Sequence, residues 1–417
     1  MNRGMPLGMV LLAIISWWGQ ATGQVKRGAF GQEAELTDSG GTAFDDLGFS
    51  VSTNGNTVVT ATGGAVDIYL EPSGGWANMT TPTAQLTVSG DALVQVCIAG
   101  TTIVAVGSSG VAYVYVMPSS GWTSSSQPNA TLIASDGAVF TNVAMNGNLV
   151  VAGAPTADGG QSQQGAAYVF VMPTSGWSNM TQTAKLTASD GVTNDHLGIS
   201  VSASAAMVLV GAQDATVGTQ CPKNCHLFQG AAYVFVKPAN GWVNMNQTAK
   251  LTTVDGGPGD NFGAAVSIND NGATALIGAS QSDTVTGPGA AYIFIKPNTG
   301  WQNTATYAAR LTASDGVKFD TFGYCVALSG SSTNTAVVGA INATVDKNHW
   351  SQGKVYVFVE PSGGWKTSKE TAKLIAADGK AGDVFGYSVA INGTTIAIGT
   401  PYRAVGSNKA QGMVYIY

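Results

Sequence analysis

A short unit ending in Gly-Trp recurs along most of this 417-residue chain and limits its possible folds more than any other feature. In each copy the Trp comes nine residues after the start of an apolar run such as Tyr233-Val-Phe-Val. A fixed period is typical of repeat architectures, in which each copy is one supersecondary unit. The six copies, about 58 residues apart on average, end at Trp76, Trp122, Trp177, Trp242, Trp301 and Trp365.

Each repeat has the pattern of four short strands. In the last complete repeat they are residues 372–375, 385–391, 395–398 and 413–417, with an Asn-Gly hairpin turn at 392–393. No window shows sustained helical periodicity. Seven such units predict an all-β fold, a seven-bladed β-propeller of four-stranded blades.

The two ends of the repeat array predict how the ring closes. The array begins with Ala34-Glu-Leu36, a strand that in other repeats follows the Tyr-Val-Phe-Val run. It stops at Val414-Tyr-Ile-Tyr417, a run that lacks this follower. The N-terminal strand is therefore expected to complete the last blade, which leaves no unpaired sheet edge at the junction.

Three motifs recur in register and together resemble the FG-GAP repeat. In the last repeat they begin at Phe385-Gly, Ile396-Ala-Ile-Gly and Gly412-x-Val-Tyr, and related sets begin at Phe322 and Phe262. The chain is similar in this respect to exported bacterial FG-GAP proteins and, more distantly, to the propeller of integrin alpha subunits. The resemblance implies a single propeller domain over residues 30–417 and a binding or adhesion role outside the cell.

Integrin-like blades often carry an Asp-rich calcium loop between their first two strands, and this chain departs from that pattern. Its turns there are short, such as Asn146-Gly, and only Asn269-Asp-Asn-Gly272 resembles a calcium loop. Such a loop needs several oxygen ligands at alternate positions. Family-type calcium sites are expected to be mostly absent, and Ca²⁺ is the one candidate cofactor.

The N-terminus has the pattern of a secretory signal peptide over residues 1–23. Arg3 supplies a positive charge, Met9 to Trp18 form an apolar stretch, and Ala21-Thr-Gly23 offers small residues for cleavage. The apolar stretch is about half of the roughly 20 residues that a membrane-spanning helix needs. We expect a secreted or cell-surface protein without a membrane span after cleavage, and an uncleaved anchor is the alternative.

Charge limits the partners. Charged residues make up 10% of the chain, the net charge is −6, and Lys and Arg do not cluster. Nucleic-acid binding needs a basic surface and is not expected. The expected partner is an extracellular protein or glycan, and the protein is expected to be a monomer.

Four cysteines are too few for a disulfide framework. Cys221 and Cys225 are separated by three residues in a polar insertion, which favours a small local disulfide. A zinc site there would need more ligands than the adjacent His226. Cys97 and Cys325 lie in apolar strands and are expected to be buried thiols.

Antiparallel strands place the loops of a propeller on two faces. We number the strands of a blade outward from the centre. Loops 1–2 and 3–4 then lie on one face, which we call the hairpin face, and they are tight turns of the Asn-Gly and Pro-x-x-Gly-Trp types. Its Trp residues are expected to pack between blades, with exposed sugar platforms as the alternative. Loops 2–3 and 4–1 share the variable face, where binding is expected because the 2–3 loops differ in length and composition. These 2–3 loops are residues 155–165, 213–230, 280–289, 341–353 and 401–412.

Paired aspartates recur in the 4–1 loops of the variable face. The simpler interpretation is that each Asp accepts backbone N–H groups and fixes the turn. The alternative is a ring of carboxylates that attracts a divalent cation, which calorimetric calcium titration would test. The pairs are Asp190/Asp195, Asp255/Asp260, Asp315/Asp320 and Asp378/Asp383, with single members at Asp45 and Asp136.

No catalytic motif stands out. The three histidines, His196, His226 and His349, do not share a metal-binding spacing. The chain is therefore interpreted as a binding or adhesion module rather than an enzyme. A hydrolase or lyase acting at the channel mouth, and a structural surface protein without a small-molecule ligand, are the alternatives. Six Asn-x-Thr sequons would be glycosylated only in a host with that machinery, and they begin at Asn78, Asn129, Asn179, Asn246, Asn342 and Asn392.

Overall fold

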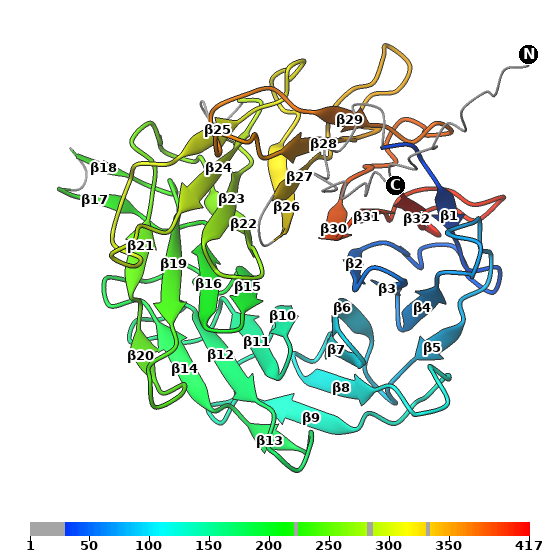
Figure 1. The fold of residues 1–417 in the computed structure, drawn as a ribbon, viewed down its shortest axis with the longest axis horizontal. Coiled ribbons are helices and arrows are strands. Elements are labelled where there is room, and N and C mark those ends of the chain that lie inside the picture. The colour runs from blue at the N-terminus through cyan, green and yellow to red at the C-terminus, as the bar shows by residue number, and fades with distance from the viewer. Residues whose placement is uncertain (1–29, 221–223, 282–286, 331–333) are drawn as a thin grey trace, which may run out of the picture.

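The computed structural model describes residues 30–220, 224–281, 287–330 and 334–417. The regular elements of this described part are all strands, and they form seven four-stranded sheets arranged around a central axis (Figure 1). The predicted seven-bladed β-propeller is confirmed. The predicted signal peptide at residues 1–23 lies outside the described residues.

Each blade is an antiparallel sheet whose strands follow one another outward from the centre. Blade 1 contains β2 (Ser50–Thr53), β3 (Thr57–Ala61), β4 (Val66–Leu70) and β5 (Ala84–Leu86). Blade 2 contains β6 (Leu93–Ala99), β7 (Thr102–Gly107), β8 (Ala112–Val116) and β9 (Ala130–Ile133). Blade 3 contains β10 (Asn142–Asn146), β11 (Leu149–Ala154), β12 (Ala166–Val171) and β14 (Ala184–Thr187). Blade 4 contains β15 (Ser200–Ser204), β16 (Met207–Ala212), β19 (Ala231–Val236) and β21 (Ala249–Leu251).

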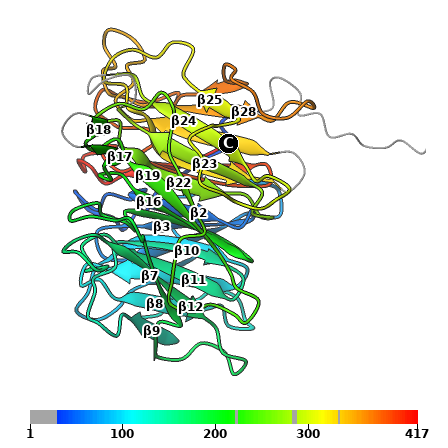
Figure 2. The same cartoon turned by 90° about the vertical axis from the view of Figure 1, so that its left-hand side faces the viewer.

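The remaining three blades repeat this order. Blade 5 contains β22 (Phe262–Ile268), β23 (Thr274–Ala279), β24 (Ala290–Ile295) and β25 (Ala309–Leu311). Blade 6 contains β26 (Phe322–Ser329), β27 (Thr335–Ala340), β28 (Lys354–Val359) and β29 (Ala372–Leu374). Blade 7 contains β30 (Ser388–Asn392), β31 (Thr395–Thr400), β32 (Met413–Ile416) and β1 (Ala34–Leu36). Two short strands, β13 (Met180–Thr181) and β20 (Met245–Asn246), add to the outer edges of blades 2 and 3. Two others, β17 (Val217–Gln220) and β18 (Asn224–His226), form a hairpin within the 2–3 loop of blade 4 (Figures 1 and 2).

The hydrophobic core lies between blades. The middle strands are rich in Val, Ile, Tyr and Phe and are almost fully buried on both sides, because each blade is covered by two neighbours. The core divides into seven clusters, and each cluster joins residues of two adjacent blades. Stability of the ring therefore depends on every blade having both neighbours.

The N-terminal strand closes the ring as the sequence predicts. β1 pairs antiparallel with β32, with Ala34 opposite Ile416 and Leu36 opposite Val414. Leu36 is completely buried in the cluster between blades 7 and 1. On the inner strands, the Ser388 hydroxyl donates to the Gly48 carbonyl at 2.7 Å across the same junction. Residues from both ends of the chain therefore share one blade.

The Gly-Trp units are structural. Trp242, for example, is 6% exposed and packs in the cluster between blades 3 and 4, and only Trp177 is half-buried. The expected packing between blades is confirmed. The residue two positions after each Trp has a role that the sequence analysis missed, because it accepts a hydrogen bond from the outer strand of the preceding blade. Asn179 accepts from the Thr131 N–H at 2.9 Å, and Asn78, Ser124, Asn244, Asn303 and Thr367 make the equivalent bond.

The cysteine expectations have three outcomes. Cys97 is buried, as expected. Cys325 lies on an inner strand at the wall of the central cavity and is half-buried as a residue, but its thiol is buried, and this burial raises the pKa of the thiol to about 12. Its thiol donates to the Gly386 carbonyl of the next blade at 2.8 Å, just as the Ser388 hydroxyl donates to the Gly48 carbonyl across the following junction. The predicted disulfide between Cys221 and Cys225 involves side chains outside the described residues.

Blade 1 carries a buried carboxylate where other blades carry a tyrosine. Asp67 lies opposite Gln85 across β4 and β5, at the position where Tyr168 faces Lys185 in blade 3. The Asp67 side chain is completely buried, and the Gln85 amide donates to its Oδ1 at 3.0 Å. Burial raises the pKa of Asp67 from 3.8 to about 7, against the opposing effect of the Gln85 hydrogen bond.

Replacing Asp67 by Asn should therefore change how stability depends on pH. The unfolded chain releases the Asp67 proton near pH 4 and the folded chain near pH 7, so the wild type loses stability as pH rises through this window. Relative to that of the wild type, the free energy of unfolding of Asp67→Asn should rise by up to about 4 kcal/mol between pH 4 and pH 8. Urea unfolding at several pH values measures the difference. A wild-type-to-variant difference that stays constant with pH would contradict the prediction.

Candidate binding site

The second aspartate of each 4–1 loop fixes the loop. The Asp195 carboxylate accepts the Val192 N–H at 2.8 Å, and Asp45, Asp260, Asp320 and Asp383 accept the N–H three residues before them in the same way. Asp195, Asp260, Asp320 and Asp383 are buried. Burial raises the pKa of Asp195, Asp320 and Asp383, and the backbone hydrogen bond opposes this effect. The simpler sequence interpretation is confirmed for these residues.

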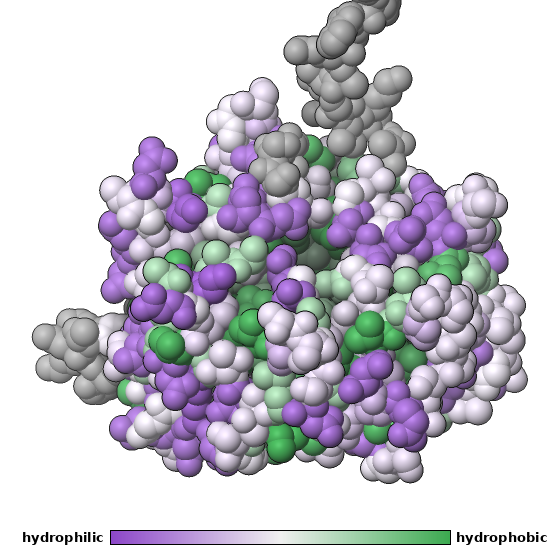
Figure 3. Space-filling view, turned by 60° about the horizontal axis from the view of Figure 1, so that its bottom comes forward, coloured by the Kyte–Doolittle hydropathy of each residue, from purple (hydrophilic) through white to green (hydrophobic). Residues whose placement is uncertain are grey.

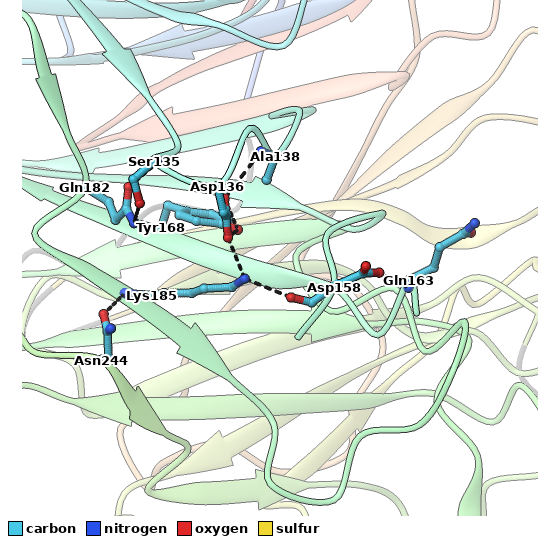
Figure 4. A network of polar contacts seen from close by, with 9 residues as sticks. All are labelled: Ser135, Asp136, Ala138, Asp158, Gln163, Tyr168, Gln182, Lys185 and Asn244. Atoms are coloured by element: carbon cyan, nitrogen blue, oxygen red, sulfur yellow. Dashed lines mark hydrogen bonds and ion pairs between the residues drawn. The ribbon is translucent and has the colours of Figure 1, made fainter. Parts of the chain in front are cut away.

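The first aspartate of each pair meets a cation from a neighbouring strand or loop. Figure 4 shows the arrangement at Asp136, where Lys185 Nζ lies 2.7 Å and the Tyr168 hydroxyl 2.8 Å from Oδ2. Burial would raise the pKa of Asp136, but these hydrogen bonds outweigh it and the pKa is lowered. The corresponding ion pairs are Lys250–Asp190, Arg310–Asp255, Lys354–Asp315, Lys373–Asp315 and Arg403–Asp378.

The paired aspartates thus serve two different purposes within each loop. Among the described residues, no group of three or more His, Cys, Asp or Glu side chains is placed to hold a metal ion. The carboxylates of Asp190, Asp255, Asp315 and Asp378 already face cations. Calcium binding by these loops stays a prediction for calorimetry.

Exposed apolar side chains gather on the variable face. Within the described ranges, thirteen large apolar residues are exposed, and ten of them lie on 2–3 or 4–1 loops. Phe44, Phe319 and Trp350 are more than half exposed, at 69%, 60% and 62%. Figure 3 brings forward the part of the ring at the bottom of Figure 1, and the surface seen there is mainly hydrophilic, with small apolar patches. The ten residues are Phe44, Val139, Val192, Leu227, Phe228, Val254, Val317, Phe319, Trp350 and Tyr402.

A cavity of about 590 Å³ lies at the centre of the ring, a size that suits a small ligand. All seven blades contribute to its wall, through residues at or just before the start of their inner strands. Residues of three 2–3 loops, Gln213, Gln281 and Asn342, also line it. Because these loops belong to the variable face, the cavity adjoins that face.

One side of the cavity is aromatic. Tyr324, Tyr387 and Phe49 come from the consecutive blades 6, 7 and 1, at the position directly after the Phe-Gly or Leu-Gly pair. The Tyr387 ring centroid lies 5.0 Å from that of Phe49 and 5.4 Å from that of Tyr324. Tyr402, from the 2–3 loop of blade 7, is 46% exposed, and its ring centroid lies 6.0 Å from that of Tyr387. We call these four residues the aromatic arc.

The aromatic arc breaks the symmetry of the repeat. Blades 4 and 5 carry Ile199 and Ala264 at the position of Phe49, so the aromatic rings are confined to one side. Burial raises the pKa of Tyr387, and the hydrogen bond with Tyr324 adds to this effect, so the phenol stays neutral at physiological pH. The sequence analysis missed the arc. An alignment of the seven repeats at this one position would have shown it.

A single carboxylate lies beside the arc. Asp46 precedes Leu47-Gly48 in the 4–1 loop of blade 1, with φ of 54°, a left-handed conformation that Asp tolerates better than most residues. Its charge acts on both Tyr387 and Tyr402 and raises their pKa values, although burial is the larger cause for each. Burial and the nearby Asp45 raise the pKa of Asp46. Within the described residues its carboxylate makes no hydrogen bond.

The fold and this site define a seven-bladed β-propeller of the kind that serves as a binding or structural module. The family model described as FG-GAP repeat matches residues 128–170, 180–235, 245–294, 306–358 and 369–417. The chain therefore belongs to the FG-GAP repeat family, as its motifs suggest. FG-GAP repeats are typical of extracellular proteins.

No curated protein sequence matches the chain. The crystal structure of the computationally designed Ika8 protein is similar at 13% identity and a TM-score of 0.47, over 93% of this chain and 99% of that chain. In the part of the chain that the structure describes, no helix has the length and apolar character to cross a membrane.

Proposed function

We propose that the protein is an extracellular or cell-surface binding module that contacts a protein or glycan partner through its variable face. The observation that supports this most is the gathering of exposed apolar side chains on the 2–3 and 4–1 loops. Exposed apolar side chains concentrated on one face of a folded domain are typical of an interaction surface. The loops that carry it vary between blades, whereas the strands beneath them repeat.

Export is part of the proposal. Residues 1–23 have the signal-peptide pattern, and FG-GAP repeats are typical of extracellular proteins. Phe44, Phe319 and Trp350 would form contacts at the rim of the face, and the central cavity would receive a smaller group of the same partner.

A variant of the variable face tests the proposal. It combines Phe44→Asn, Phe319→Asn and Trp350→Ser. Asn is chosen for the two Phe positions because they are left-handed, and Asn194 occupies the equivalent position of blade 4 with φ of 66°. The purified protein is screened against glycans and extracellular matrix proteins. The triple variant should bind the retained partner at least about tenfold more weakly, since exposed aromatic residues dominate interface energies.

The matched control changes exposed apolar residues away from the variable face. Val243→Ser and Ile295→Thr remove side chains that are 49% and 43% exposed, and this double variant should bind like the wild type. Loss of binding in the control but not in the triple variant would contradict the proposal. Turnover of a bound glycan in the same screen would favour the hydrolase or lyase alternative.

A further inference from the structure

We propose that the central cavity is a binding site for an uncharged carbohydrate, with a sugar ring stacked on the aromatic arc. This inference rests on the proposed function, since the cavity adjoins the variable face. It goes further by naming a ligand class and the residues that select it. Three properties of the cavity wall support it: the absence of charge, the free amides and the one-sided aromatic surface.

The cavity wall carries no charge. Among its described lining residues there is no Asp, Glu, Lys, Arg or His. An anionic ligand would lose its hydration in the cavity and find no opposite charge there, which is costly. The nearby Asp46 carboxylate adds a further obstacle for anions. Phosphates, uronic acids and sialic acids are therefore disfavoured as ligands.

Amide side chains supply the polar part of the wall. Gln95, Gln213, Asn261, Gln281 and Asn342 line the cavity, are half-buried, and make no side-chain hydrogen bond within the described residues. Asn142 donates to the Ile199 carbonyl at 2.7 Å and keeps its own carbonyl oxygen available. Each amide can both donate and accept, as each sugar hydroxyl can. A purely apolar ligand would bury these groups without partners and is disfavoured.

The aromatic arc supplies the apolar part. A pyranose ring presents C–H groups on its faces and hydroxyl groups around its edge. Tyr387, Phe49 and Tyr324 can cover one face, while the amides of blades 2 to 5 lie across the ring of blades from them. Small-ligand sites combine apolar surface with polar groups that fix the orientation of the ligand. Here the polar groups suit a ligand rich in hydroxyl groups.

The test is a calorimetric titration of the purified protein with neutral hexose and N-acetylhexosamine oligosaccharides and with their sialylated or uronic counterparts. The protein is produced without N-glycosylation, because Asn342 belongs both to the cavity wall and to a sequon. We expect binding of at least one neutral oligosaccharide at concentrations up to about 10 mM, and weaker or no binding of its charged counterpart.

Four variants identify the site. Tyr387→Ala should weaken binding at least about tenfold, whereas Tyr387→Phe, which keeps the stacking ring, should change it less than about threefold. Gln213→Ala removes an amide without a hydrogen-bond partner in the described part, so it should fold normally and still weaken binding. Val243→Ser changes a side chain that is 49% exposed, away from the variable face and outside the cavity lining, and it should leave sugar binding unchanged.

Three results would overturn the inference: no binding of any neutral oligosaccharide, tighter binding of the charged counterparts, or equal binding by the wild type, Tyr387→Ala and Gln213→Ala. The proposed function fails differently. It fails if the triple variant of the variable face binds the retained partner like the wild type, whatever the sugar titration shows. If the triple variant loses that partner but no neutral oligosaccharide binds, the binding face stands and the carbohydrate site is wrong.

Discussion

Removal of residues 30–36 is expected to abolish cooperative folding of the whole ring. The deletion takes away β1, exposes the edge of β32 and empties the fully buried position of Leu36 between blades 7 and 1. Truncating one buried Leu already costs about 2–5 kcal/mol. The total stability of a domain is only about 5–15 kcal/mol, so losing the whole strand should be fatal. Thermal unfolding followed by circular dichroism should show no sharp transition.

A circular permutant supplies the control. It begins at Thr37 and carries residues 30–36 after Tyr417, joined by a copy of the blade 6 segment 360–371 that connects β28 to β29. Every strand then keeps its partner, and blade 7 becomes continuous in sequence like the other six. The permutant should melt within a few degrees of the wild type. A deletion variant that melts like the wild type would show that the N-terminal strand does not close the ring.

Replacement of Arg403 by Met should destabilise the protein by about 3–5 kcal/mol at neutral pH. The Arg403 side chain is 7% exposed; its Nη1 lies 2.9 Å from Asp383 Oδ2, and its Nη2 contacts Asp378. Without the guanidinium, Asp383 is a buried carboxylate facing no cation. Burial already raises the pKa of Asp383, so the variant should recover part of its stability as pH falls and this carboxyl takes up a proton. Urea unfolding at pH 7 and pH 4.5 measures both effects.

Two further variants show whether the buried charge is the cause. Adding Asp383→Asn to Arg403→Met should restore part of the lost stability, because no uncompensated charge then remains at that position. Lys250→Met breaks an ion pair whose Asp190 is 45% exposed, and it should cost about 1 kcal/mol or less. Equal costs for Arg403→Met and Lys250→Met would contradict this account of Arg403.

The sequence predicted the scaffold because the information there is repeated. Alternating apolar residues, Asn-Gly turns and Gly-Trp units occur in each repeat, so a single misleading residue changes little. The missing partner of Val414–Tyr417 even indicated the closure by Ala34–Leu36, which the structure confirms. The Trp residues were correctly interpreted because a large apolar side chain at a repeated position favours packing between blades.

The central cavity could not be predicted by the same reasoning. Its wall takes two to five residues from each repeat, and neighbours such as Phe49 and Tyr387 are more than 300 residues apart in the sequence. The residue types at these positions differ between repeats, so a search for repeated residues does not identify them. The repeated aspartates attracted attention instead, and the structure shows that their carboxylates meet backbone N–H groups, lysines and arginines.

The contrast suggests where function resides in this ring. The repeated residues hold blades together, as Asn179 and Ser388 do across blade boundaries. The residues that differ between blades, including Tyr387 and Trp350, lie on the variable face or in the cavity beside it. A symmetric scaffold therefore presents one asymmetric surface, on which we expect a ligand to bind in a single orientation.

Hydrogen exchange in the presence and absence of the retained partner tests the central claim, that the variable face binds. The partner should slow exchange in the 4–1 segments before β2 and β30 and in the 2–3 loops 341–353 and 401–412, with no change in the Asn-Gly hairpins or the Pro-x-x-Gly-Trp turns. Protection confined to those hairpins and turns would place the partner on the opposite face and contradict the account.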